Sequence, residues 1–385
     1  MTTIEYQLKK MPDERAQQFI ADMLSHSYRI DRLVFADNCM QVDVADAVSD
    51  AEFADQLTQL LFIAKNLDVD VQYEQRRDRV CCENPQPYLE QRRTVQKIAD
   101  GMYLLQGPFL KAFHALNRYV KDVADRYNAV EQEYPTLWPL DLYKKINYFK
   151  EFPQQVIMCA ALHDDYETLK NFSNRYDQSC TYDRVALADG FNDSVFGLES
   201  AVCDCCYYAL QDQADFSNTV YTCYNKVFRN EGHTGEGMKR LTNFSVRDIM
   251  FVGDETFVLS MRQKMIDEAI ELVKYLDLDC SIETANDPFF ANESILKNTF
   301  QYASKLKYEV LARLPYDDSR LAVGSVNLHL DFFGRAFNIR LTDGSFAHSG
   351  CLGFGFERLV FALYCQYGHD ESAWPDGLKE RLGLG

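Results

Sequence analysis

The chain has 385 residues, 47% of them apolar, and its formal net charge is −18. Its length exceeds the roughly 100–200 residues of one typical domain, so two domains are expected. The longest apolar runs are far shorter than the roughly 20 residues that cross a bilayer, and the N-terminus lacks the apolar core of a signal peptide. We therefore expect a cytoplasmic protein with no membrane partner, whose twelve cysteines are thiols or metal ligands rather than disulfides.

Residues 1–90 are predicted to form a small α+β domain that ends in a linker. Apolar spacing predicts helices over 13–26 and 50–67. Alternating residues predict strands over 29–35 and 40–44, joined by a turn at Asp37 and Asn38, and a further strand over 68–73. The charged, proline-containing stretch 72–93 is interpreted as the linker. No residue pattern in this unit indicates chemistry, so a docking module and a structural appendage both fit.

Residues 91–385 are predicted to form the second domain. It begins with a long amphipathic helix after Gly107 and Pro108, followed by a segment that ends at Pro139. No long heptad array, internal repeat or low-complexity tract is present, so a coiled-coil arm is not expected.

A predicted hairpin over 221–254 carries the first candidate site residues. Arg229 and Glu231 leave its first strand, and Phe244 precedes the apolar run of the second. An arginine fork suits a phosphate, a glutamate can accept from an exocyclic amine, and a phenylalanine face can stack on a base. The pattern therefore fits an adenine nucleotide, although an ordinary solvated hairpin fits the same stretch equally well.

A second motif lies about a hundred residues further along the chain. The run GFGFER ends at Arg358 and leads into an apolar helix, an arrangement that again suits phosphate oxygens. Together, FRNE and GFGFER resemble motifs 2 and 3 of the class II aminoacyl-tRNA synthetases. From about Tyr103 to Tyr367, the chain resembles the amino acid:[carrier protein] ligases, which are truncated relatives of the zinc-dependent seryl-tRNA synthetases. The run SVNLHLDFFGRAFNIRLTDGSFAHSGCLGFGFERL carries much of this resemblance.

The resemblance implies an α+β fold in which helices flank a class II synthetase-type antiparallel sheet. It implies that Arg229 binds the α-phosphate of ATP, Arg358 the γ-phosphate and Glu231 the adenine amino group, while Phe244 stacks on the adenine. It places Asn327, and with it His329, on a strand that faces the substrate pocket. Magnesium would bridge the phosphates, with no ligand assigned. The helix and strand that end at Pro139 resemble motif 1, which in the family builds a homodimer.

The resemblance also implies one zinc ion. Judged by residue type alone, the cysteines of AVCDCCYYAL are more often buried thiols than ligands. In the resembled branch, two cysteines and a carboxylate bind zinc, and the matching positions here are Cys206, Asp248 and Cys351. Cys203 and Cys205 remain alternatives for the first ligand, and the family has glutamate where this chain has Asp248. Three protein ligands leave a fourth position open for the amine of an amino acid.

The implied activity is ATP-dependent formation of an aminoacyl-adenylate from a small amino acid. The implied acceptor is the phosphopantetheine thiol of a carrier protein. Two alternatives remain: a seryl-type synthetase that charges tRNA, and a non-catalytic synthetase paralogue. The acidic charge and the missing coiled coil disfavour tRNA, and the complete set of phosphate-binding residues disfavours the paralogue.

Overall fold

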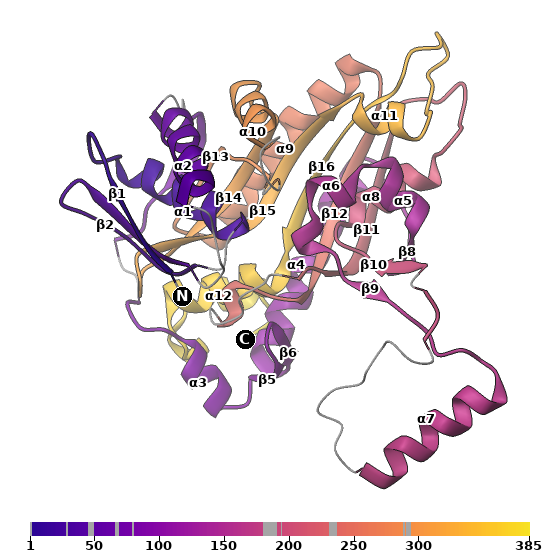
Figure 1. Ribbon diagram of the computed structural model, residues 1–385. Helices are drawn as coiled ribbons and strands as arrows, with labels where there is room; N and C mark the ends of the chain where they lie inside the picture. Colours follow the sequence, from indigo (N-terminus) through magenta and orange to yellow (C-terminus); the bar gives the residue numbers. More distant parts are fainter. Residues whose placement is uncertain are drawn as a thin grey trace.

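The computed structural model (Figure 1) describes residues 2–27, 30–44, 50–65, 69–78, 81–179, 191–193, 195–230, 237–287, 289 and 294–385. Its buried apolar side chains form two separate clusters. One lies between Leu8 and Ala64, and the other between Leu89 and Leu382. The described residues thus contain a small N-terminal core and a larger second core.

The N-terminal unit packs two helices on a three-stranded antiparallel sheet of order β1-β3-β2. The predicted helices are α1 (Glu14–Ser27) and α2 (Asp50–Lys65), and the predicted strands are β2 (Ile30–Ala36) and β3 (Cys39–Val44). Asp37 and Asn38 have positive φ angles of 51° and 54° in the turn between these strands, a conformation that Asp and Asn tolerate well. Strand β1 (Thr2–Gln7), which the sequence analysis missed, completes the sheet.

An eight-stranded sheet of order β4-β13-β14-β15-β16-β12-β11-β7 forms the centre of the second unit. It is antiparallel except for the short parallel pair of β7 and β11. The expected synthetase-type sheet flanked by helices is therefore present. Its strands are β4 (Val71–Gln75), β7 (Val130–Glu131), β11 (Thr219–Phe228), β12 (Asn243–Gly253), β13 (Cys280–Thr284), β14 (Lys307–Leu314), β15 (Ser319–Leu330) and β16 (His348–Gly355).

The boundary between the units differs from the predicted linker. Strand β4 lies within residues expected to form the N-terminal unit and the linker, yet it pairs with β13 at the edge of the large sheet. Helix α3 (Gln86–Gln91) also lies inside the predicted linker, and its Leu89 belongs to the larger core. This pairing was not predicted from the sequence, because β13 is some 200 residues away in the chain.

Three helices cover one face of the large sheet: α4 (Gly107–Arg126), α9 (Glu255–Leu276) and α12 (Phe356–Tyr367). Arg247 of β12 donates to Asn117 of α4 over 2.7 Å, which ties this helix to the central strands. Arg126 of α4 forms an ion pair with Glu268 of α9 over 2.5 Å, so these two helices lie side by side. The side chains of the candidate site lie on the opposite face of the sheet.

Smaller elements surround this centre. Strands β8 (Leu137–Pro139), β10 (Phe196–Leu198) and β9 (Met158–Cys159) form a small antiparallel sheet, and helix α7 (Tyr166–Ser179) extends from it, away from the body of the molecule (Figure 1). Strands β5 (Val95–Ala99) and β6 (Met102–Leu105) form a hairpin. The remaining helices are α5 (Leu140–Lys145), α6 (Tyr148–Glu151), α8 (Val202–Ala209), α10 (Ser294–Ala303), α11 (Phe332–Ala336) and α13 (Asp376–Arg381), with three short 3₁₀ helices η1 (Pro153–Gln155), η2 (Gly237–Lys239) and η3 (Glu371–Ala373).

Among the described residues, no helix has both the length and the hydrophobicity that crossing a membrane requires.

The two cores predict two separable unfolding transitions. Leu57 of α2 and Leu363 of α12 are both fully buried, one in each core. A Leu→Ala change at a buried site costs about 2–5 kcal/mol. We expect Leu57→Ala to lower only the transition of the N-terminal unit and Leu363→Ala to lower the other, as measured by calorimetry. A single transition that both changes lower equally would contradict two independent cores.

Candidate functional site

The central strands β12, β16 and β15 bring most of the candidate residues to one face of the sheet. Asp248 of β12 is paired with Gly353 of β16, which is paired in turn with Ser325 of β15. Gly353 is required at this point, because a Cβ atom there would lie 2.1 Å from Oδ1 of Asp248. The glycine of GFGFER therefore makes room for the carboxylate on the neighbouring strand.

Three buried side chains converge on this point. The ligand atoms of Cys203 on α8, Asp248 on β12 and Cys351 on β16 all lie within 4.8 Å of one another. Their residues are only 8%, 5% and 2% exposed. Two thiols and a carboxylate at this spacing are a donor set suited to a tetrahedral divalent metal, with one position left for a further ligand.

The first cysteine of this group is Cys203, one of the two alternatives, and the structure does not place the preferred Cys206 in the group. The Cys206 thiol instead meets the Tyr134 hydroxyl, and burial raises its pKa to about 12. Cys205 also lies outside the group, where burial and the neighbouring Glu199 raise its thiol pKa. Cys206 was preferred because its position matches a ligand position of the resembled branch, and such a match does not tell which thiol of the helix faces the sheet.

The surroundings of the group stabilise a thiolate on Cys351. The Cys203 thiol, and with it His329 and Asn327, holds the pKa of Cys351 well below its usual range. Asn327 donates to the sulfur over 3.4 Å, and Nε2 of His329 lies 3.9 Å from it. Burial and the charge of Cys351 raise the pKa of Asp248. A thiolate on Cys351 therefore disfavours a second negative charge on Asp248, and a bound cation would allow both groups to be ionised.

His329 is itself held from its other side. Its Nδ1 lies 3.3 Å from the hydroxyl oxygens of Tyr207 and Ser349, and its ring packs edge-on against Phe333. Asn327 and His329 thus lie on the strand that faces the pocket, where the sequence analysis expected them. Both contact the Cys351 sulfur.

The expected nucleotide residues lie next to this group. The guanidinium carbons of Arg229 and Arg358 lie 5.5 and 5.6 Å from the centroid of the Phe244 ring. Nε of Arg229 donates to the Ser200 carbonyl over 3.0 Å. The structure therefore brings together three of the four residues expected to bind ATP, while Glu231 lies outside the described residues.

Glu357 fixes the start of α12, which carries Arg358. Its buried carboxylate accepts from the backbone nitrogen of Ser245 over 2.8 Å and from the Ser245 hydroxyl over 2.9 Å. Lys226 of β11 completes the arrangement over 3.2 Å. The two strands of the hairpin and the arginine-bearing helix are thus held in one unit.

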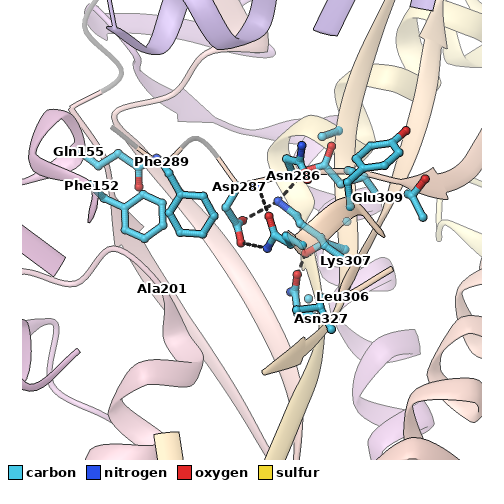
Figure 2. A pocket seen from close by; sticks show the side chains of 18 of the residues that line it. Phe152, Gln155, Ala201, Asn286, Asp287, Phe289, Leu306, Lys307, Glu309 and Asn327 are labelled. Atoms are coloured by element: carbon cyan, nitrogen blue, oxygen red, sulfur yellow. Dashed lines mark hydrogen bonds and ion pairs between the residues drawn. The ribbon is translucent and has the colours of Figure 1, made fainter. Parts of the chain in front are cut away.

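The group of Cys203, Asp248 and Cys351 lines one cavity of 1520 Å³, together with Arg229, Phe244 and Arg358. The cavity extends past the hairpin to the N-terminal unit, where Ala16, Phe19 and Ile30 contribute to its wall. In another part of its wall, Lys307 contacts Asp287 (Figure 2), beside the paired rings of Phe152 and Phe289. This charged part of the wall was not predicted from the sequence. The alternation of Lys307 and Glu309 with apolar residues along β14 was the signal available for it.

No family model matches the chain. The chain is 24% identical over 295 residues to the type-2 serine–tRNA ligase of Methanothermobacter thermautotrophicus, covering 75% of this chain and 58% of that protein. It is 26% identical over 243 residues to amino acid–[acyl-carrier-protein] ligase 1 of Bradyrhizobium diazoefficiens, covering 63% of this chain and 72% of that protein.

Solved structures show the same fold. The M. kandleri SerRS, solved in complex with A. aeolicus tRNASec, matches with a TM-score of 0.72 and 17% identity, over 99% of this chain and 77% of that one. The cytoplasmic serine–tRNA ligase of Naegleria fowleri, solved with AMP, matches with a TM-score of 0.60 and 12% identity, over 88% of this chain and 81% of that one. The chain therefore has the fold of the class II synthetases.

One buried carboxyl predicts a pH dependence of stability. Burial and the nearby Asp204 and Asp248 raise the pKa of Glu199 to about 9. Between the pKa of about 4.3 in the unfolded chain and this value, only the unfolded state loses the proton, so stability falls as the pH rises. The slope is at most about 1.4 kcal/mol per pH unit.

Glu199→Gln removes this titration and retains an oxygen that can accept from Asn225. We expect the variant to match the wild type near pH 4 and to be increasingly more stable toward pH 9, as measured by thermal unfolding. Parallel pH profiles of the two proteins would show that the Glu199 carboxyl is ionised in the native state.

Proposed function

We propose that this chain, a homologue of the type-2 serine–tRNA ligases and the amino acid–[acyl-carrier-protein] ligases, activates a small amino acid with ATP and transfers it to the phosphopantetheine thiol of a carrier protein. The observation that carries the proposal is a single cavity. It holds a buried group of two cysteines and an aspartate beside two arginines that flank a phenylalanine ring. The first group suits an amine-binding metal, and the second suits a nucleotide.

Cys203, Asp248 and Cys351 would hold zinc, which supplies a Lewis-acid position for the free amine of the amino acid. The fit rests on the donor set and on its surroundings. The two thiols are soft ligands, the group is buried, and Asn327 donates to the Cys351 sulfur. Asp248 lies with both cysteines although its side chain is shorter than the glutamate of the resembled branch. Because Asn327 contacts the Cys351 sulfur, it is assigned to the part of the pocket that binds the amino acid.

In the first half-reaction, a carboxylate oxygen of the amino acid attacks the α-phosphorus of ATP. The new P–O bond replaces the bond to the β-phosphate, and pyrophosphate leaves. This chemistry requires positioning and charge stabilisation rather than a protein nucleophile. Arg229 is assigned to the α-phosphate, Arg358 to the γ-phosphate and Phe244 to the adenine ring, with Glu231 accepting from the adenine amino group. Magnesium is expected to accompany the phosphates.

In the second half-reaction, the sulfur of the carrier thiol attacks the activated carbonyl carbon. A thioester forms, AMP leaves and the thiol proton is lost to solvent or to a base. The sequence match that covers 72% of a carrier-protein ligase supports this acceptor. The net charge of −18 supports it as well. Binding of tRNA depends on Lys and Arg that neutralise its phosphates, and an acidic protein disfavours such binding.

A second candidate acceptor is tRNA. The observation that favours it is the structural match to M. kandleri SerRS, which covers 99% of the chain and so includes the N-terminal unit. A tRNA acceptor changes only the second half-reaction, because a ribose hydroxyl then attacks the same carbonyl carbon.

We also propose that the protein acts as a homodimer through the region around Pro139. Exposed apolar side chains of this region support a protein contact. They are Val130 of the sheet edge, Leu137 of β8 and Phe196 of β10, the last paired with Pro139.

The activation step is tested by amino-acid-dependent exchange of pyrophosphate into ATP. Loss of a charged hydrogen bond to developing phosphate charge costs about 3–4 kcal/mol, or two to three orders of magnitude in rate. We expect Arg358→Ala to reduce exchange by this factor, and Arg126→Ala, on an outer helix, to leave it unchanged. Exchange by Arg358→Ala at the wild-type rate would refute the assignment.

Metal content tests the ligand set separately from activity. We expect about one zinc per chain in purified wild-type protein, measured by elemental analysis. Cys203→Ala and Cys351→Ala should each lose most of it, while Cys206→Ala should keep it. If Cys206→Ala lost the zinc and Cys203→Ala kept it, the first ligand would be Cys206.

A further inference from the structure

A further carboxylate, that of Asp204, lies beside the proposed metal ligands. Asp204 follows Cys203 on α8, is only 6% exposed and lines the same cavity. The charges of His329, Cys351 and Arg229 all act on this carboxylate. Asp204 is therefore near both the group proposed to bind an amine and the arginine assigned to the α-phosphate. The amino acid has to lie between these two places.

The carboxylate of Asp204 is incompletely paired. Among the described residues, its one hydrogen-bond donor is the Cys203 thiol, whose sulfur lies 3.7 Å from Oδ1, and it forms no ion pair. A buried carboxylate is costly unless a cation or several donors complete it. A metal binds the thiolate, so metal binding would remove the Cys203 proton and with it this one donor. A ligand in the cavity can supply the missing positive partner.

The neighbouring wall of the cavity is aromatic. Tyr148 of α6 and Phe152 line it, and their ring centroids lie 5.1 Å apart. The charge of Asp204 acts on the Tyr148 hydroxyl, yet this hydroxyl donates to Oε1 of Gln155 over 2.9 Å. Phe152 and Gln155 lie side by side at this wall (Figure 2). A carboxylate near aromatic rings suits an ammonium group, because the ring faces attract a cation.

We propose that Asp204 binds the side-chain ammonium of a short diamino acid, and that this class of amino acid is the substrate. The inference rests on the proposed function, which places the α-amine at the metal ligands and the carboxylate near Arg229. Because Oδ1 of Asp204 lies 3.7 Å from the Cys203 sulfur, the two amines must lie close together.

A side chain with one or two methylenes meets this requirement, as in 2,3-diaminopropionate and 2,4-diaminobutyrate. A hydroxyl, as in serine, donates a hydrogen bond but leaves the buried charge without a cation. Glycine and alanine supply no donor at all.

The test compares these two diamino acids with alanine and serine. Full-length protein is loaded with equimolar zinc. Binding is measured by isothermal titration calorimetry without ATP, and pyrophosphate exchange gives kcat/KM for each amino acid. We expect at least one diamino acid to be preferred over alanine and serine by about tenfold or more in both measurements.

Asp204→Asn should remove this preference, because asparagine carries no charge. It retains an oxygen that can accept from the Cys203 thiol, so the fold and the zinc content should be preserved, as checked by thermal unfolding and elemental analysis. Asp376→Asn is the matched control. Asp376 is fully exposed on α13, and this variant should keep the wild-type preference.

Two results would overturn the inference. One is a wild-type protein that prefers alanine or serine, or that does not distinguish them from the diamino acids. The other is a diamino acid preference that persists in Asp204→Asn, which would mean that both amines bind the metal. Absence of exchange with every amino acid would instead count against the proposed function, and the calorimetric comparison would still decide the role of Asp204.

Discussion

The structure depends most on how buried negative charge is accommodated on the face of the central sheet that lines the cavity. Cys203, Asp248 and Cys351 lie within 4.8 Å of one another and are almost fully buried. Two unit charges at this separation repel each other by about 3 kcal/mol at an effective dielectric constant of 20. The group therefore stays partly protonated, as the raised pKa of Asp248 indicates, unless a cation is present. This constraint explains why a metal is the natural partner of the group.

The neighbouring residues follow from the same constraint. Gly353 leaves the space that the Asp248 carboxylate occupies, and Asn327 and His329 direct polar atoms at the Cys351 sulfur. On the other face of β12, the strand that carries Asp248, Arg247 is hydrogen-bonded to Asn117 of α4. The strand that carries the aspartate is thereby anchored to the helix that covers the sheet.

The sequence predicted those parts of the fold that depend on local periodicity. Helices α1, α2 and α4 and the turn at Asp37 and Asn38 were predicted because spacing and turn chemistry act over a few residues. Strand β4 was assigned to the wrong unit because its partner is distant in the chain. The choice among the cysteines of α8 depends on the direction in which each side chain points. That direction cannot be read from a single sequence.

The central claim is that a carrier protein, rather than tRNA, accepts the activated amino acid. The most direct measurement offers the protein a radiolabelled amino acid and ATP, with either total tRNA or a panel of phosphopantetheinylated carrier proteins. The account predicts label on a carrier protein, released by hydroxylamine as expected for a thioester. Label on tRNA, with none on any carrier protein, would contradict the claim and leave only the activation half-reaction in place.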